Sequence, residues 1–172
     1  EMKNLGFNVT VLQDRVWTQL SPRIRVLTLA DYNQDGILLV DINGTLVMDL
    51  NDASPRGWAG FIKKISRPYE NSFVLQLCGF GDPDIAYFDE DGEKIEPRAA
   101  LRLPVGRTMS RVADFYGAKY ILPFSSLHKY QRADSVWANQ YLTSLSEYSD
   151  GFASHRAELL PAFIQYECVT NT

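Results

Sequence analysis

The chain has 172 residues, of which 45% are hydrophobic and 12% aromatic, enough for a sizeable core in a single domain or half-domain spanning 1–172. Its formal net charge is -4, and its basic residues are scattered with Lys63-Lys64 as the densest pair, which argues against a nucleic-acid partner. No apolar run approaches the roughly 18 residues of a membrane span, and no signal peptide precedes the first expected strand. Cys78 and Cys168 form no metal-type or disulfide pattern, so we expect reduced thiols and a cytoplasmic location.

The first fifty residues predict a run of strands. Apolar residues at alternate positions place one face of each strand in the core. The Asn43-Gly44 pair is the strongest short signal for a hairpin turn, so the two strands that flank it should pair. The expected strands are 7–12, 16–20, 24–29, 36–40 and 45–50.

Helices and strands alternate in the rest of the chain. Ser54-Pro55 supplies an N-cap and a first-turn proline, and the apolar spacing that follows predicts a helix over about 55–66. Further strands are expected at 72–79 and 119–123, and further helices at 108–116, 134–145 and 154–163. The fold class is therefore α/β, with a mixed sheet and helices on one face.

Two of these strands end in residues that can bind a metal ion. His128, one of only two histidines, follows the strand at 119–123, and Asp52 follows the strand at 45–50. A histidine beyond the carboxyl end of a strand is well placed to bind a metal or transfer a proton. The alternative is that it only donates and accepts hydrogen bonds, which is the commoner role of a single histidine.

The segment Asp31-Tyr32-Asn33-Gln34-Asp35-Gly36 matches the opening of an EF-hand calcium loop. The twelfth position is Ile42, where a bidentate glutamate is needed, so the pattern does not predict a calcium site. The segment is either a solvated turn or an acidic turn that faces a metal site.

The order of elements and two motifs resemble the C-terminal half of metallo-β-lactamase-fold proteins. The motifs are Asn51-Asp52 after a strand and the segment from Pro123 to Asn139, which reads Pro-Phe-Ser-Ser-Leu-His-Lys-Tyr-Gln-Arg-Ala-Asp-Ser-Val-Trp-Ala-Asn. The resemblance covers about 8–137, and the similar branch contains metal-dependent hydrolases and CMP-N-acetylneuraminate hydroxylase. It implies a four-layer αβ/βα sandwich of two similar halves, of which this chain would supply one.

The resemblance also implies a set of site residues. Asp52 would ligate or bridge metal, and His128 would be the last histidine ligand; their strands are expected to be parallel neighbours. The donors suit zinc, iron or manganese, as one or two ions. The family's middle histidine is replaced by Asp31 to Asp35, so Asp31, Asn33 or Asp35 could substitute for it. Asn51 and Asp134 are candidates for supporting roles.

The ligand motif H-x-H-x-D-H does not occur in these residues. A catalytic metal usually needs three protein ligands or more, so we expect a separate N-terminal half to be the partner, with a homo-oligomer as a further possibility. Glu1 before Met2 favours a fragment over a degenerate protein.

Three functions remain open at this point. The first is a hydrolase whose metal-bound water attacks a small-molecule ester, lactone or phosphodiester, with Tyr130, Arg132 and Asp134 shaping the pocket. Arg132 would bind an anionic group or form an ion pair with Asp134, and Asp134 would either cap a helix or orient His128. The others are an iron-dependent oxygenase of the same fold and a non-catalytic interaction domain.

Overall fold

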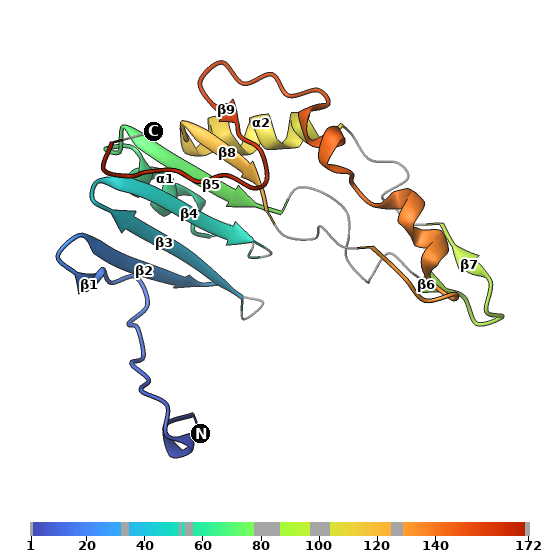
Figure 1. Ribbon diagram of the computed structural model, residues 1–172, viewed down its shortest axis with the longest axis horizontal. Coiled ribbons are helices and arrows are strands. Elements are labelled where there is room, and N and C mark those ends of the chain that lie inside the picture. The colour runs from blue at the N-terminus through green and yellow to red at the C-terminus, as the bar shows by residue number, and fades with distance from the viewer. Residues whose placement is uncertain are drawn as a thin grey trace.

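The computed structural model describes residues 2–31, 35–51, 53, 57–77, 87–96, 104–124 and 129–170. These residues form a mixed seven-stranded sheet, a small two-stranded hairpin and several helices, which confirms the α/β class (Figure 1). The strands are β1 (Thr18–Ser21), β2 (Ile24–Ala30), β3 (Gly36–Ile42), β4 (Thr45–Asn51), β5 (Asn71–Gln76), β6 (Tyr87–Phe88), β7 (Lys94–Ile95), β8 (Tyr120–Pro123) and β9 (Glu158–Leu159). The helices are α1 (Ala59–Ser66), α2 (Val105–Tyr116) and the 3-10 helices η1 (Met2–Leu5), η4 (Val136–Tyr141) and η5 (Leu145–Ser149).

The first half of the sheet is an antiparallel meander in the order β1-β2-β3-β4. Asn43 and Gly44 both have positive φ angles, 53° and 87°, which is the backbone that a tight hairpin turn requires. The predicted hairpin is therefore present. Asp41, just before this turn, accepts the Gly44 N–H at 2.9 Å and so fixes the turn to its own strand.

Asp41 is also the centre of a polar cluster below the hairpin. Its carboxylate accepts hydrogen bonds from Arg25 Nε at 2.9 Å and from the Tyr69 hydroxyl at 2.8 Å. The Arg25 guanidinium lies over the Trp17 ring at 4.6 Å. The cluster connects two antiparallel strands to the segment that leads into β5.

The second half of the sheet is parallel, in the order β4-β5-β8-β9. Parallel neighbours need a crossover connection, and α1 supplies the one between β4 and β5 while α2 precedes β8. Helix α2 ends at Gly117, whose φ of 68° is a left-handed conformation typical of helix C-termini.

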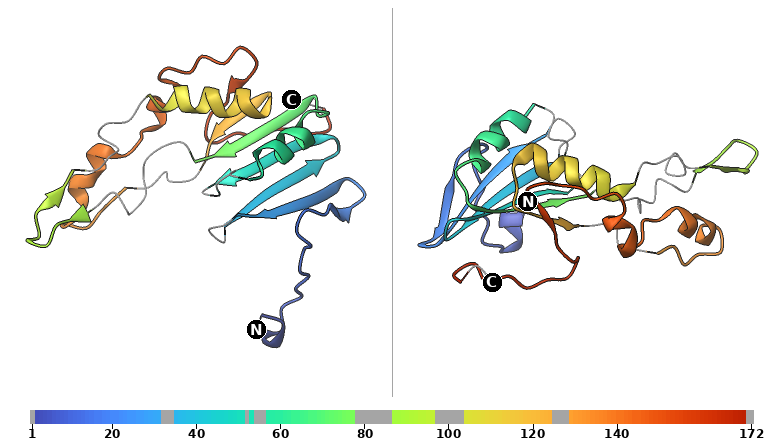
Figure 2. Two further views of the ribbon diagram at one scale, coloured as in Figure 1. Left: turned by 180° about the vertical axis from the view of Figure 1, so that it is seen from behind. Right: turned by 90° about the horizontal axis from the view of Figure 1, so that it is seen from above.

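The main core lies between the sheet and the two α-helices. Alternate residues of the central strands are fully buried on this face and pack against Ile62 of α1 and Met109 and Ala113 of α2. Figure 2 shows α1 and α2 on one side of the sheet and the C-terminal segment along the other. The expectation of helices on one face is thus met in the described residues.

The opposite face, here called the second face, is less deeply buried. It carries a small cluster of Phe73, Leu122 and Leu160, against which Val47, Leu75, Tyr120 and Tyr166 pack. Tyr166 comes from the C-terminal segment and meets the Phe73 ring edge-on, with centroids 4.6 Å apart.

Three predicted elements are wrong. Residues 7–12 form no strand and are mostly exposed, because no neighbouring strand covers their apolar side chains. The segment 134–145 forms two short 3-10 helices, η4 and the start of η5, in place of one α-helix, and 154–163 forms β9 in place of a helix. Glu158 and Leu159 add to the edge of β8, and Pro161 follows, so sheet pairing prevailed over helical spacing.

The boundaries of the other elements shift by a few residues. Helix α1 begins at Ala59 with Trp58 at the N-cap, while the proposed cap at Ser54-Pro55 lies outside the described residues. The strand expected at 72–79 is β5, and its last two predicted positions also lie outside them. Among the described helices none is long and apolar enough to cross a bilayer.

Candidate functional site

The carboxyl ends of β4, β5 and β8 form one row at a single edge of the sheet. Asn51 pairs with Gln76, and Gln76 pairs with Pro123, so the three parallel strands end in register. Strand β2 runs in the same direction as β4, because both are antiparallel to β3 (Figure 1). Asp31 follows the last residue of β2 and so lies at this edge too. In α/β sheets this is the edge at which ligands usually bind.

Asp52 and His128, the two predicted metal ligands, lie outside the described residues. The strands that lead to them can still be compared. They were expected to be neighbours, but β5 lies between them. Two strand spacings of about 4.8 Å separate β4 from β8 by about 10 Å, a span that two ligand side chains and an ion can bridge.

Asp31 and Asp35 lie further along the same edge. Asp31 is 8% exposed, and its carboxylate accepts the Asp35 N–H at 3.1 Å, so it closes the turn between β2 and β3. Four strand spacings, about 19 Å, separate β2 from β8, too far for an ion near the end of β8 to share a ligand from β2. Asn33 lies outside the described residues.

The last residue of β4 has an unusual backbone. Asn51 has a φ of 33°, and the register between β4 and β5 shifts between Asp49 and Asn51. Its carbonyl accepts Gln76 Nε2 at 3.2 Å and the Leu77 N–H at 3.4 Å, so β5 holds this conformation. Strained backbone of this kind persists where the surroundings fix it, and it is common at functional sites.

Asp49 is a candidate that the sequence analysis did not single out. It lies on the second face, opposite Leu38 of β3 and Leu75 of β5. Its Oδ1 is buried and has no hydrogen-bond partner among the described residues. Burial raises the pKa of its carboxyl, and the Asn51 N–H partly offsets this. The signal was a single acid inside an apolar strand, one position before the predicted strand end.

The predicted substrate-binding residues lie beyond the end of β8, in the part of the chain that packs against the β6-β7 hairpin through Phe88 and Trp137. Asn139 fixes the backbone of Tyr130 on both sides, accepting its N–H at 2.8 Å and donating to its carbonyl at 2.9 Å. Arg132 forms a two-point ion pair with Asp134, through Nε at 3.2 Å and Nη2 at 2.7 Å. Of the two roles considered for Arg132, the ion pair is the one observed.

Asp134 does not have the predicted capping role. Ser135 is the N-cap residue of η4, and no side chain caps that helix. The hydrogen bond from Arg132 is the largest cause that lowers the pKa of the Asp134 carboxyl. Its second proposed role, as an acceptor for His128, involves a residue outside the described ranges.

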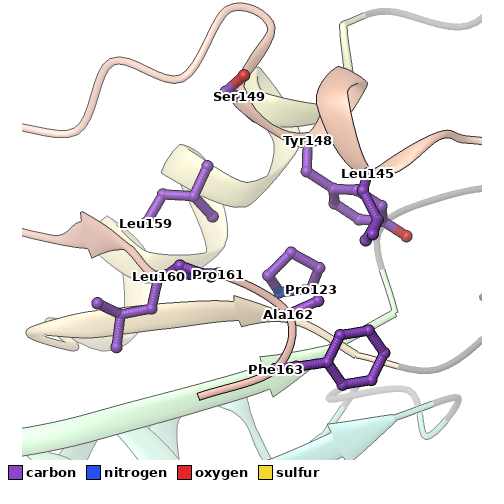
Figure 3. A pocket seen from close by; sticks show the side chains of 9 residues that line it. All are labelled: Pro123, Leu145, Tyr148, Ser149, Leu159, Leu160, Pro161, Ala162 and Phe163. Carbon is purple, nitrogen blue, oxygen red and sulfur yellow. The ribbon is translucent and has the colours of Figure 1, made fainter.

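A mostly apolar pocket of about 410 Å³ lies beside the end of β8 (Figure 3). Pro123 ends β8 at one side, and Tyr148 of η5 and Phe163 of the C-terminal segment lie around it. Figure 3 shows these side chains arranged around one opening. The remaining lining residues are Leu145, Ser149, Leu159, Leu160, Pro161 and Ala162.

Within the described ranges, no three His, Cys, Asp or Glu side chains lie close enough together to hold a metal ion. The two predicted ligands, Asp52 and His128, lie outside these ranges. Comparison of the chain with family models and with curated proteins returned no match.

Proposed function

We propose that this chain supplies one half of the metal site of a metal-dependent hydrolase with a metallo-β-lactamase-like fold. The observation that carries the proposal is the row of strand ends at Asn51, Gln76 and Pro123. It brings the segments that continue to Asp52 and His128 to one edge of the sheet.

The donor set suits a divalent metal. A carboxylate and a neutral imidazole are ligands of zinc, iron and manganese, and such an ion would supply a bound water of near-neutral pKa as the nucleophile. This chain offers two of the ligands, fewer than the three or more of a catalytic site. The others would come from an N-terminal half that carries H-x-H-x-D-H.

The second face supports a two-part site. Leu38, Val40 and Val47 are only partly buried there, although they lie on central strands. Apolar side chains in this position gain about 25 cal/mol for each Å² that a partner covers. A second half-domain laid across this face would also cover Asp49.

The pocket beside β8 supports an ester or lactone with an apolar part. Its lining is mostly apolar and includes Pro123, the last residue of β8. Arg132, the residue considered for an anionic group, is already paired with Asp134, which makes a phosphodiester the weaker choice.

Metal content tests the proposal. The full reading frame around this chain would be expressed, and the metal in the purified protein measured by mass spectrometry, beside the 172-residue chain alone. We expect stoichiometric metal in the complete protein and little in the chain alone. Loss of a group that only orients a ligand costs roughly 10- to 100-fold in metal affinity, so Asp52→Asn and His128→Gln should cost at least as much.

His155→Gln and Asp91→Asn are matched controls, because both residues are exposed and neither belongs to β4, β5 or β8. Neither should change the metal content. A complete protein without metal would replace the proposal with the non-catalytic domain. Iron together with oxygen-dependent turnover would replace it with the oxygenase.

A further inference from the structure

A second cleft lies on the opposite side of the molecule from the second face, between α1 and the C-terminal end of α2. Its volume is about 500 Å³. Four basic side chains line it: Lys63, Lys64 and Arg67 from the end of α1, and Arg156 from the loop before β9. This is a local concentration of positive charge in a chain of net charge -4.

The negative charges at the cleft do not balance these four. Asp114 is the only carboxylate among the lining residues, and it accepts a hydrogen bond from the Ser154 hydroxyl. The C-terminal ends of α1 and α2 each contribute roughly half a negative charge. About two positive charges therefore remain, and no ion pair of Lys63, Lys64, Arg67 or Arg156 is present among the described residues.

The cleft is held together by hydrogen bonds between its walls. The Ser66 hydroxyl donates to the Tyr116 carbonyl at 2.8 Å and so joins the last turn of α1 to that of α2. The Ser154 hydroxyl donates to the Asp114 carboxylate of α2 and so ties the loop to the same end of that helix, while its oxygen accepts the Arg156 N–H at 3.1 Å within the loop. Two separate segments, the end of α1 and the loop before β9, thus present their basic side chains to one space.

We propose that this cleft binds the phosphate dianion of a small molecule, either free phosphate or a phosphate ester. A dianion matches the surplus of about two positive charges, and lysine and arginine are the side chains that bind phosphate through charge-assisted hydrogen bonds. The volume suits a small ligand. A nucleic acid fits less well, because the net negative charge of the chain would repel a long polyanion. This proposal is independent of the proposed metal site.

Calorimetric titration of the 172-residue chain tests it, with inorganic phosphate, pyrophosphate, phenyl phosphate and a twelve-nucleotide single-stranded DNA as probes. We expect saturable binding of one phosphate probe per chain. A Lys63→Gln/Arg67→Gln variant should bind at least about tenfold more weakly, since each lost charged hydrogen bond costs about that factor. Preference for phenyl phosphate over phosphate would identify an ester as the ligand, and the reverse would identify the free anion.

The matched control is Lys3→Gln/Lys94→Gln, which removes the same charge at exposed positions outside the cleft and should change affinity less than about twofold. Gly60→Glu is a second variant: a Cβ at Gly60 meets no atom within 4 Å, so there is open space in which to add a carboxylate at the cleft wall, and this variant should abolish binding. Circular dichroism checks the fold of each variant. The proposal is overturned by absence of saturable phosphate binding, by an equal loss in the control, or by DNA binding more than tenfold tighter than pyrophosphate.

Discussion

Asp49 is the residue whose chemistry differs most from its surroundings. Its neighbours on the adjoining strands are leucines, and one of its carboxylate oxygens has no partner among the described residues. Burial raises the pKa of this carboxyl above its ordinary value. The pH dependence of the free energy of unfolding distinguishes Asp49 from an ordinary surface acid.

The stability of the chain should depend on the ionisation of Asp49. Because its folded pKa lies above the ordinary 3.8, the folded chain keeps a proton that the unfolded chain releases. The free energy of unfolding therefore falls as pH rises through the interval between 3.8 and the folded pKa. Thermal melts from pH 3 to 7 should show that Asp49→Asn gains stability over the unaltered chain as pH rises. A difference in Tm that is independent of pH would contradict this.

Asp41 should contribute more to stability than any exposed acid. Its carboxylate is paired with Arg25 and Tyr69 and is 8% exposed, so Asp41→Asn leaves a partly buried guanidinium without its countercharge. Losing one partner of a fully buried pair costs 3–5 kcal/mol, and because the Arg25 side chain is 42% exposed we expect about 2 kcal/mol. Urea unfolding gives this value directly.

Asp134→Asn is the control for that measurement. It breaks an ion pair of similar geometry whose side chains are 82% and 58% exposed, and it should cost less than about 0.5 kcal/mol. Equal losses in the two variants would show that the Asp41 cluster adds nothing beyond a surface pair.

The sequence could predict some of these residue contacts and not others. The predicted Asn43-Gly44 turn sets the register of β3 with β4, but Arg25 lies opposite Asp41 through the register of β2 with β3, which that turn does not determine. Tyr69 could not be placed, because its position depends on how α1 crosses the sheet. Asp52 and His128 were identified by motif alone, and their proximity remains a prediction.

At the scale of elements, the strands of the meander were predicted best, since alternation and a hairpin turn are local signals. The α-helices expected after residue 130 were wrong because contacts with residues distant in the sequence determine the structure there. Apolar residues at helical spacing in 134–145 pack in two 3-10 turns, where Trp137 meets Phe88 of a distant hairpin. Strand β9 forms only because β8 offers it an edge. Neither contact is visible in the local pattern.

Two glycines in helices should respond oppositely to alanine. A methyl group at Gly106 of α2 would meet the backbone of the η5 segment, at 2.8 Å from both Phe152 N and Tyr148 O and closer still to Asp150 O. Gly106→Ala should therefore cost about 3 kcal/mol, since the backbone must move apart. Gly60 of α1 has open space around it, and Gly60→Ala should stabilise by about 0.5 to 1 kcal/mol. The denaturant midpoints of the two variants test this. An unchanged midpoint for Gly106→Ala would show that the backbone of 148–152 can move away from α2 at little cost.

At the scale of the whole molecule, the two ends of the chain should differ in importance. Residues 2–10 extend away from the sheet and are mostly exposed, so deletion of the first ten residues should change stability by less than about 0.5 kcal/mol (Figure 1). Deletion of 164–172 removes Tyr166 from Phe73 and Tyr120 and should cost about 2 kcal/mol. It should also increase binding of a hydrophobic dye, which reports the uncovered second face. Equal effects of the two deletions would show that Tyr166 does not protect this face.

The ends of the sheet determine how another chain can approach. An unpaired edge strand offers a row of backbone N–H and C=O groups to which a foreign strand can add. Here β1 is four residues long and irregular between Gln19 and Ser21, and β9 is two residues long and followed by Pro161. Such edges give an intruding strand few hydrogen bonds in sequence, so edge-to-edge aggregation is discouraged on both sides. A partner gains more binding free energy by covering the apolar side chains of the second face. We therefore expect this chain to associate through side-chain surfaces that fit each other and not by pairing of strand edges.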